Sequence, residues 1–309
     1  MLRVIVVLVY FAVAQSAFAQ KERAARQPII DMHVHAMAAD ERWNIKVPNP
    51  VTNQPMVAMT EQAHMEATLA EMDRYNVKKA MISGNETDYE AGLRWNKKAP
   101  DRILVSYGFD NPAKADLDFI RREAKAGRLK GIGEIGPQYE GIAPNDPTLE
   151  PIYALAEELD LPLAIHIGLG PPGAAYVGAA KYRMALSDPL LLEEVLIRHP
   201  KLRLYVMHAG WPMIDRMIGL LYAHPQVYVD IAVINWTQPR KEFHAYLRRL
   251  VEAGYGKRIM FGSDQMVWPE AIGMGVDAIN AADFLSAEQK ADIFYNNAAR
   301  FLRLPDATK

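Results

Sequence analysis

PIIDMHVHA, residues 28–36, is the stretch from which the fold can be argued. Its apolar residues are typical of a buried strand, and polar side chains occupy alternate positions toward its end. Residues two apart on a strand point to the same face, so we expect His33 and His35 to project together, with Asp31 one layer deeper. Two such histidines can chelate one ion. The alternative is a strand that carries two histidines with ordinary hydrogen-bond partners.

The rest of the chain alternates between short β-rich runs and longer segments with helical spacing, such as Met65, Leu69 and Met72 behind Thr60 as a candidate N-cap. Ser286 and Gln289 form a capping-box pattern at the start of a last helix. This alternation predicts parallel strands joined by helical crossovers, and eight repeats predict a single-domain (β/α)8 TIM barrel rather than an open doubly wound sheet. The predicted strands are Pro28–Val34, Lys78–Ser83, Ile103–Gly108, Lys130–Ile135, Leu161–Ile167, Leu202–Met207, Val227–Ile231 and Arg258–Gly262.

Residues 1–19 have the features of a cleavable secretory signal peptide. Arg3 is the only charge before Lys21, residues 4–14 are almost wholly apolar, and residues 17–19 form a small-x-small cleavage site. An uncleaved anchor is the alternative, although the apolar run is short for a membrane span. We expect a periplasmic or secreted protein that is not attached to a membrane after cleavage. The expected organisation is a signal peptide (1–19), a linker (20–27), the barrel domain (28–303) and a tail (304–309).

Composition limits the possible partners and cofactors. The 309-residue chain is 50% apolar and 23% charged, as in ordinary globular proteins. Its net charge of −2 gives no basic surface that would indicate a nucleic-acid partner. Cysteine is absent, so disulfides and thiolate metal sites are excluded, and any metal must be bound by nitrogen and oxygen atoms. A small-molecule substrate is the expected partner, and a homo-oligomer stays open.

Polar side chains gather where the predicted strands end, which in a TIM barrel is the face that carries active sites. Buried polar groups need partners, and one shared cation would satisfy several of them at once. Alternation also predicts that Leu204 and Val206 fill the barrel interior below His208. The strand-end residues are His33 and His35 on the first strand, Glu134 on the fourth, His166 on the fifth, His208 on the sixth and Asp264 just past the eighth.

This pattern, from Asp31-Met-His33-Val-His35 to Gly262-Ser-Asp264, resembles the amidohydrolase superfamily. More narrowly, it is similar to the amidohydrolase-related branch, which contains aminocarboxymuconate-semialdehyde decarboxylase and aromatic acid decarboxylases alongside lactonases and other hydrolases. The segments His199-Pro200 through His208-Ala-Gly210 and Asn296-Asn-Ala-Ala-Arg300 also resemble that branch. The resemblance spans residues 28 to 303; its motifs are specific for the fold and the metal, and poor for the substrate.

The resemblance implies that one divalent ion, with Zn²⁺ as the expected metal, is held by His33, His35, His166 and Asp264. His208 would be a group close to that ion, a catalytic group, or a ligand to a second ion. Glu134 departs from the many superfamily members that place a carboxylated lysine at the end of strand four. Lys130 starts that strand, about 13 Å from Glu134 at about 3.3 Å per residue, and is expected to be exposed at the base.

The run Gly133-Glu134-Ile135-Gly136 instead resembles members that bridge two ions with a glutamate, including TatD-like nucleases. Glu134 is therefore a candidate bridging ligand, or an acid/base or substrate contact near a single ion; a purely structural role is the third reading. The number of ions, one or two, depends on this choice.

The expected reaction is metal-dependent hydrolysis of a C–N or C–O bond in an amide, lactone or ester. A divalent cation lowers the pKa of its water from 15.7 to about 7. Asp264 would take the proton of that water, and His208 would polarise the carbonyl or stabilise the oxyanion. The alternative is a lyase on the same site, a non-oxidative decarboxylase or hydratase of an aromatic or unsaturated carboxylic acid. No arginine lies in a strand-end motif, and Arg183 is the nearest candidate for binding a carboxylate, which favours hydrolysis.

A binding protein without catalysis is the third hypothesis. Tyr139, Trp211 and Trp268 follow strand-end residues closely and are expected to line a substrate pocket, with ordinary loop packing as the alternative. Asp230, at the end of strand seven, is interpreted as a packing residue or a neighbour of the ligands. The remaining histidines fall in or just after predicted helices and are expected at the surface: His64, His199, His224 and His244.

Overall fold

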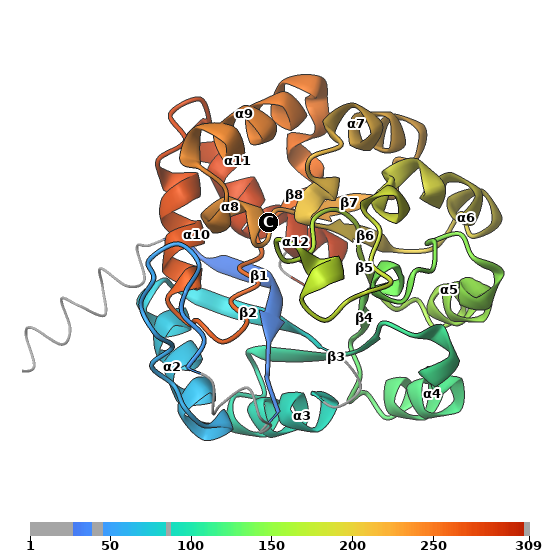
Figure 1. Ribbon diagram of the computed structural model, residues 1–309, viewed down its shortest axis with the longest axis horizontal. Coiled ribbons are helices and arrows are strands. Elements are labelled where there is room, and N and C mark those ends of the chain that lie inside the picture. Colours follow the sequence, from blue (N-terminus) through green and yellow to red (C-terminus); the bar gives the residue numbers. More distant parts are fainter. Residues whose placement is uncertain (1–26, 39–45, 85–87, 306–309) are drawn as a thin grey trace, which may run out of the picture.

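The computed structural model describes residues 27–38, 46–84 and 88–305. Eight parallel strands follow one another in sequence order around a barrel, and the helices surround it, as Figure 1 shows. This confirms the predicted eight-stranded barrel with a single domain. The strands are β1 (Ile29–His35), β2 (Val77–Ser83), β3 (Ile103–Phe109), β4 (Gly131–Ile135), β5 (Leu163–His166), β6 (Leu204–Met207), β7 (Tyr228–Asp230) and β8 (Ile259–Met260).

The last strand is shorter than predicted because the chain beyond Met260 bonds to β1 in an irregular way. The backbone N–H of Met32 donates to the carbonyl of Phe261 at 2.9 Å, and the N–H of Asp264 donates to the carbonyl of His33 at 2.7 Å. These bonds join the segment after β8 to β1. They bring the two ends of the sheet together and place Asp264 beside the histidines of β1.

Helices cover the outside of the barrel (Figure 1). Thr60 caps α2 by accepting the N–H of Ala63, and Ser286 and Gln289 form the predicted capping box of α11. The predicted last helix is interrupted by a wider turn at residues 292–296. The helices are α2 (Glu61–Arg74), α3 (Tyr89–Lys98), α4 (Leu117–Lys125), α5 (Glu150–Glu158), α6 (Glu193–Arg198), α7 (Ile214–Ala223), α8 (Ile234–Thr237), α9 (Arg240–Leu250), α10 (Ala271–Asn280), α11 (Ala287–Ala291) and α12 (Asn297–Phe301).

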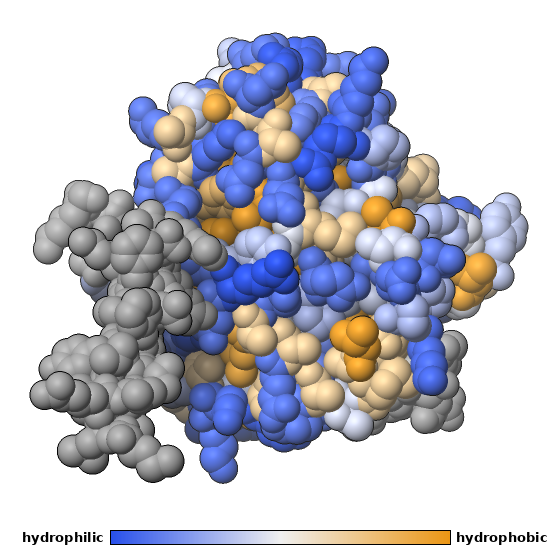
Figure 2. Space-filling model, turned by 90° about the vertical axis from the view of Figure 1, so that its left-hand side faces the viewer, coloured by the Kyte–Doolittle hydropathy of each residue, from blue (hydrophilic) through white to orange (hydrophobic). Residues whose placement is uncertain are grey.

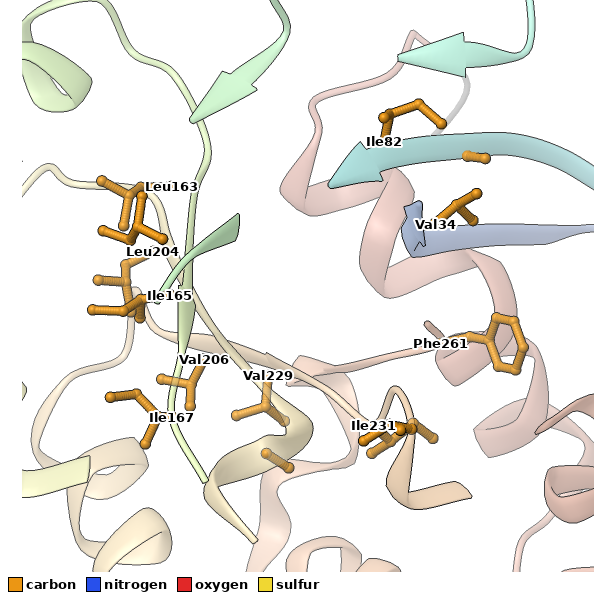
Figure 3. Close-up of a cluster of buried hydrophobic side chains, with 14 of the residues drawn as sticks. Val34, Ile82, Leu163, Ile165, Ile167, Leu204, Val206, Val229, Ile231 and Phe261 are labelled. Carbon is orange, nitrogen blue, oxygen red and sulfur yellow. The ribbon is translucent and has the colours of Figure 1, made fainter. Parts of the chain in front are cut away.

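Two apolar clusters hold the barrel. The larger one lies between the strands and the helices and includes Leu204 and Val206, which Figure 3 shows beside residues of the neighbouring strands. The smaller one fills the barrel interior with Tyr205 and Met207, below which α12 packs. The prediction that Leu204 and Val206 fill the interior was therefore wrong: these two side chains face the helices, and Tyr205 and Met207 point into the barrel. His208 still reaches the mouth because the strand ends before it and its φ is +58°, which turns the chain.

Several predictions fall partly or wholly on residues outside the described ranges. The proposed signal peptide at 1–19, most of the linker at 20–27 and the end of the tail at 304–309 lie there. Within the described residues, no helix has the length and apolar character needed to cross a bilayer. Figure 2 shows one face of the molecule, on which hydrophilic side chains predominate and hydrophobic ones are scattered in small groups, as on globular proteins in general.

Candidate metal centre

Six ionisable side chains from five strands meet at the C-terminal mouth of the barrel. β1 brings His33 and His35, and the segment after β8 brings Asp264; we call these three residues the β1/β8 group. His166 from β5 and His208 just after β6 form the β5/β6 group. Glu134 from β4 lies between the two groups. The structure thus brings together every residue that the sequence proposed as a ligand or catalytic group.

In the β1/β8 group, three ligand-type atoms face one another. The Nε2 atoms of His33 and His35 are 3.2 Å apart. The Oδ1 atom of Asp264 lies 2.9 Å from Nε2 of His35 and 3.6 Å from Nε2 of His33. The Oε2 atom of Glu134 lies 3.4 Å from Nε2 of His33 and 3.7 Å from Nε2 of His35. Glu134 therefore completes this group with one of its two oxygens.

The other oxygen of Glu134 faces the β5/β6 group. Its Oε1 atom lies 3.8 Å from Nε2 of His166 and 3.8 Å from Nε2 of His208. The two imidazole rings meet edge to face with centroids 4.6 Å apart. A carboxylate with one oxygen toward each pair of imidazoles is the arrangement of a bridging ligand. The two groups also touch directly, because one ligand atom each of His33, His208 and Asp264 lie within 4.8 Å of one another.

These residues fit a divalent metal. Two ligands of one ion with bonds of about 2.1 Å stand about 3.0–3.4 Å apart, close to the separations above. When the Nε2 atoms carry no hydrogen, they and the ionised carboxylate oxygens are all acceptors, and they face one another here. Oδ1 of Asp264 is buried, and its contact with Nε2 of His35 at 2.9 Å is a hydrogen bond only when that nitrogen carries a hydrogen. A cation would satisfy the whole set, and nitrogen and oxygen ligands suit Zn²⁺ or Mn²⁺.

Buried residues behind the cluster orient its rings. Oδ1 of Asp230 accepts the backbone N–H groups of His208 (2.9 Å) and Ala232 (3.0 Å), while its Oδ2 lies 3.4 Å from Nδ1 of His33. Nδ1 of His208 donates to the carbonyl of Ala232 at 3.0 Å, which leaves the lone pair of the neutral ring on Nε2. Gln265 accepts the backbone N–H of His35 and donates to its carbonyl, both at 2.8 Å.

His166 has two further neighbours. The side-chain amide of Gln138 contacts its Nδ1, and Oε1 of the same amide is buried without a partner among the described residues. The two ends of an amide are alike in shape, so turning it over lets Oε1 accept the Nδ1–H of His166 and leaves the lone pair on Nε2. The Tyr139 hydroxyl lies 3.2 Å from Nε2 of His166.

Without a metal, the β1/β8 group holds a proton. Burial alone lowers the pKa of His33, but the charges of Asp264 and Glu134 outweigh it and raise that pKa well above its ordinary value. Burial alone likewise raises the pKa of Asp264 and Glu134, yet the positive charge of His33 lowers both, that of Glu134 well below its usual range. A protonated imidazole between two carboxylates is the result.

The β5/β6 group behaves differently. Burial, and then the charge of His208, lower the pKa of His166 to about 3, so this ring is neutral at physiological pH. Burial lowers the pKa of His208, but its interaction with Glu134 raises it above the ordinary value. Burial and the charge of Glu134 raise the pKa of Tyr139 well above its usual range, so its hydroxyl keeps its proton and can donate.

A cavity of about 690 Å³ opens above the cluster and reaches His35, Glu134, His166, His208 and Asp264. This size suits a small organic molecule. Tyr139 and Trp268 line it as predicted, whereas Trp211 is not among its lining residues and packs partly against the outer core. The other described lining residues are Met37, Val47, Pro48, Pro50, Val51, Gly84, Asp88, Asp110, Leu169, Gly170, Pro171, Pro172, Val233, Thr237, Gln238 and Met266.

The expectation that the remaining histidines lie at the surface was wrong for three of them. His64, His199 and His224 are buried, and His244 is half-buried. His199 contacts Glu150 at 2.9 Å and Glu157 at 3.1 Å between α5 and α6, which explains why it can be buried without a metal. Lys130 is exposed, as predicted.

Sequence reasoning did not assign the residues that orient the ligands. Asp230 was interpreted only as a packing residue or a neighbour, and Gln138 and Gln265 were not considered. Gln138 lies four residues after Glu134 and Gln265 directly after Asp264, so adjacency to a strand-end ligand was the only available signal. Polar residues are common in loops. Gln138 and Gln265 differ from most of them in being fully buried, which the sequence does not reveal.

Comparison with known proteins gives one match to a family model, described as Amidohydrolase, over residues 30–304. Among curated proteins, Protein fluG of Emericella nidulans is 22% identical over 158 residues, a match that covers 46% of this chain and 17% of that relative. The chain therefore corresponds to a minor part of that longer protein.

Solved structures with the same fold include an uncharacterised TIM-barrel protein of Bordetella bronchiseptica, with a TM-score of 0.69 at 18% identity over 89% of this chain and 98% of the other. Another is 5-carboxyvanillate decarboxylase of Novosphingobium aromaticivorans, solved with manganese and 4-hydroxy-3-methoxy-5-nitrobenzoic acid. Its TM-score is 0.62 at 18% identity, over 90% of this chain and 96% of the other. Likeness at this identity shows the fold alone.

Proposed function

Because this chain belongs to the amidohydrolase family, we propose that it is a metal-dependent hydrolase that cleaves an amide, lactone or ester bond of a small molecule. The observation that carries this proposal is the convergence of His33, His35, Glu134, His166, His208 and Asp264 at the floor of one cavity. Perturbed ionisable groups in a cleft are typical of a catalytic site.

We propose that His33, His35, Asp264 and Glu134 hold one divalent ion and that Glu134, His166 and His208 hold a second. When bound, such an ion acidifies a water molecule and polarises a substrate carbonyl. Zn²⁺ is our proposed metal because imidazole and carboxylate ligands suit it; Mn²⁺, present in the 5-carboxyvanillate decarboxylase structure, is the alternative.

The residues of the chain divide the proton transfers between them. Asp264 lines the cavity and its lowered pKa keeps it ionised, so its carboxylate can accept a proton from water and pass it to the leaving group. Tyr139, which keeps its proton, presents an O–H donor at the same face. Nδ1 of His208 is already bonded to Ala232, so its Nε2 serves the second ion; where only the ion of the β1/β8 group is bound, a protonated His208 can instead donate from Nε2 to a developing oxyanion.

A lyase that acts on a carboxylic acid is the second candidate, since 5-carboxyvanillate decarboxylase shares this fold. A carboxylate substrate calls for a fixed cation, and no lysine or arginine occurs among the described residues that line the cavity. Arg183, the candidate proposed from the sequence, donates instead to the carbonyls of Ala180 and Tyr182. These observations support hydrolysis over decarboxylation.

The test combines metal content with a substrate screen. The purified protein is stripped with a chelator, reconstituted with Zn²⁺ or Mn²⁺, measured by elemental analysis, and assayed on esters, lactones, amides and aromatic carboxylates. We expect bound metal and turnover of an ester, lactone or amide. Release of CO₂ from a carboxylate without any hydrolysis would favour the lyase, and bound metal without turnover would indicate a binding protein.

We also propose that the protein is exported, on the basis of its first 19 residues. N-terminal sequencing of protein from fractionated cells tests this: a mature chain that starts at Gln20 in the periplasm or medium is expected. An intact N-terminus in the cytoplasm would contradict export. Size-exclusion chromatography of the same sample would show whether it forms a homo-oligomer.

A further inference from the structure

One wall of the cavity is a short, apolar segment of the loop between β1 and α2. Val47, Pro48, Pro50 and Val51 all line the cavity. Between them, Asn49 is fully buried; its side-chain oxygen accepts the N–H of Val51 at 2.9 Å and that of Thr52 at 3.2 Å. The backbone of this segment is therefore fixed by its own hydrogen bonds.

The same segment is tied to the loop after β8. Nδ2 of Asn49 donates to Glu270 at 3.1 Å, and Nε1 of Trp268 donates to the carbonyl of Val47 at 3.0 Å. The Trp268 ring lines the cavity and packs edge to face on Trp236, with centroids 6.1 Å apart. This wall thus joins two loops that are distant in sequence into one apolar surface.

A second wall comes from the loop after β5, the strand that stands across the eight-stranded barrel from β1. Leu169, Pro171 and Pro172 line the cavity. The Tyr182 hydroxyl accepts the N–H of Gly170 at 2.8 Å and donates to the carbonyl of Gly168 at 3.0 Å, which holds the start of this loop in place. Both walls are therefore preorganised, and a ligand that fits them loses little free energy in ordering them.

From these walls we infer that the substrate carries a bulky apolar group without negative charge beside the scissile bond, held between the 47–51 segment and the 169–172 segment. The reasons are the apolar walls, their fixed backbone, and the absence of lysine and arginine among the described lining residues. Val51 and Leu169 are then specificity-determining residues. This inference rests on the proposed hydrolytic function and deepens it by naming the substrate class.

A binding series separates this inference from catalysis. Unbranched hydroxamic acids with two, four, six and eight carbons are titrated into Zn²⁺-reconstituted protein by calorimetry, together with chains of the same length that end in a carboxylate. We expect the dissociation constant to fall about three- to fourfold for each methylene that the walls bury. The carboxylate-ended chains should bind at least tenfold more weakly than the methyl-ended ones.

Two matched variants locate the effect. Val51→Ser should weaken binding of the eight-carbon hydroxamate by about threefold or more and leave the two-carbon compound unchanged. Val57→Ser is the control, because Val57 belongs to the same loop but is 78% exposed and is not among the cavity-lining residues. Val57→Ser should change the dissociation constant of neither the eight-carbon nor the two-carbon hydroxamate. Leu169→Ala should act like Val51→Ser from the second wall.

A dissociation constant that does not change with chain length would overturn the inference, as would equal or tighter binding of the carboxylate-ended chains. If Val51→Ser and Val57→Ser weakened binding equally, the 47–51 segment would not be the wall that contacts the apolar group. The proposed function fails separately: a steep binding series without turnover of any ester, lactone or amide would contradict hydrolysis but leave the apolar site in place. Conversely, turnover together with a dissociation constant that does not change with chain length would support hydrolysis and overturn the apolar site.

Discussion

The two halves of the candidate metal centre share Glu134 but are supported by different chemistry. In the β1/β8 group, Asp230 lies against His33 and Gln265 bonds to the backbone on both sides of His35. In the β5/β6 group, the supporting partners are a backbone carbonyl, an amide and a phenol. One half thus has a carboxylate, Asp230, among its supporting partners, and the other has only neutral ones, while Glu134 faces both halves.

The halves also differ in charge before a metal binds. In the β1/β8 group, Asp264 and Glu134 raise the pKa of His33 well above its ordinary value; in the β5/β6 group, Glu134 raises the pKa of His208, while His166 stays neutral. Partners of metal-binding imidazoles fix the ring and its tautomer, and a carboxylate partner also makes the imidazole a stronger base. We therefore expect the two halves to respond differently when they are perturbed one at a time.

The largest expected effect concerns Asp264, which we propose as the proton acceptor of the β1/β8 group. Asp264→Asn removes the proton acceptor but keeps the shape of the side chain, so the turnover number should fall by about 10²–10⁴-fold. Circular dichroism should show an unchanged fold. Asp277→Asn, at an exposed aspartate of α10, is the control and should keep full activity. An active Asp264→Asn variant would exclude this residue as the proton shuttle.

Metal stoichiometry tests whether the halves bind separate ions. Since each oxygen of Glu134 faces one half, we expect two ions per chain after reconstitution, and one ion in His166→Ala. Elemental analysis of the dialysed proteins measures both numbers. His244→Ala changes a half-buried histidine of α9 that contacts the Ala278 carbonyl and is not among the cavity-lining residues, so it should leave the count unchanged. A single ion in the wild-type protein that is lost in His166→Ala would merge the two halves into one site.

The sequence was sufficient to locate the cluster because its candidate ligands stand at strand ends, although it grouped His166 with His33, His35 and Asp264 around one ion. All eight strands were found within a few residues of their observed bounds. The His-x-His spacing in β1 placed both rings on one face, and the barrel topology then brought distant strand ends together. A pattern of residue types was enough, since the fold itself supplies the convergence.

The supporting residues could not be found in the same way. Asp230 acts through two backbone N–H groups beyond β6 and β7, and such contacts depend on where the chain turns rather than on residue spacing. The orientation of β6 was misassigned for a related reason. Leu204 and Val206 are as apolar as Tyr205 and Met207, so alternation between them gave no contrast from which to choose a face.

The next effect in size concerns Asp230. In Asp230→Asn, the amide oxygen can still accept the backbone N–H groups of His208 and Ala232. The negative charge beside His33, however, is replaced by a neutral amide group. Loss of such a partner costs about 10–100-fold in metal affinity. We expect this loss for the ion of the β1/β8 group, measured by competition with a chromophoric chelator, while the other ion is retained. Equal weakening of both ions would indicate a general structural role.

The smallest effect is the pH dependence of metal binding to the β1/β8 group, which is best isolated in His166→Ala. The pKa of His33 in the metal-free protein is raised, so at neutral pH a proton occupies the ring that the metal needs. Below that pKa the metal must displace one proton, and its affinity should rise about tenfold per pH unit between about pH 5.5 and 7. A metal affinity that does not change with pH would mean that Asp264 and Glu134 do not hold a proton on His33. The proposed difference in protonation between His33 and His166 would then be wrong.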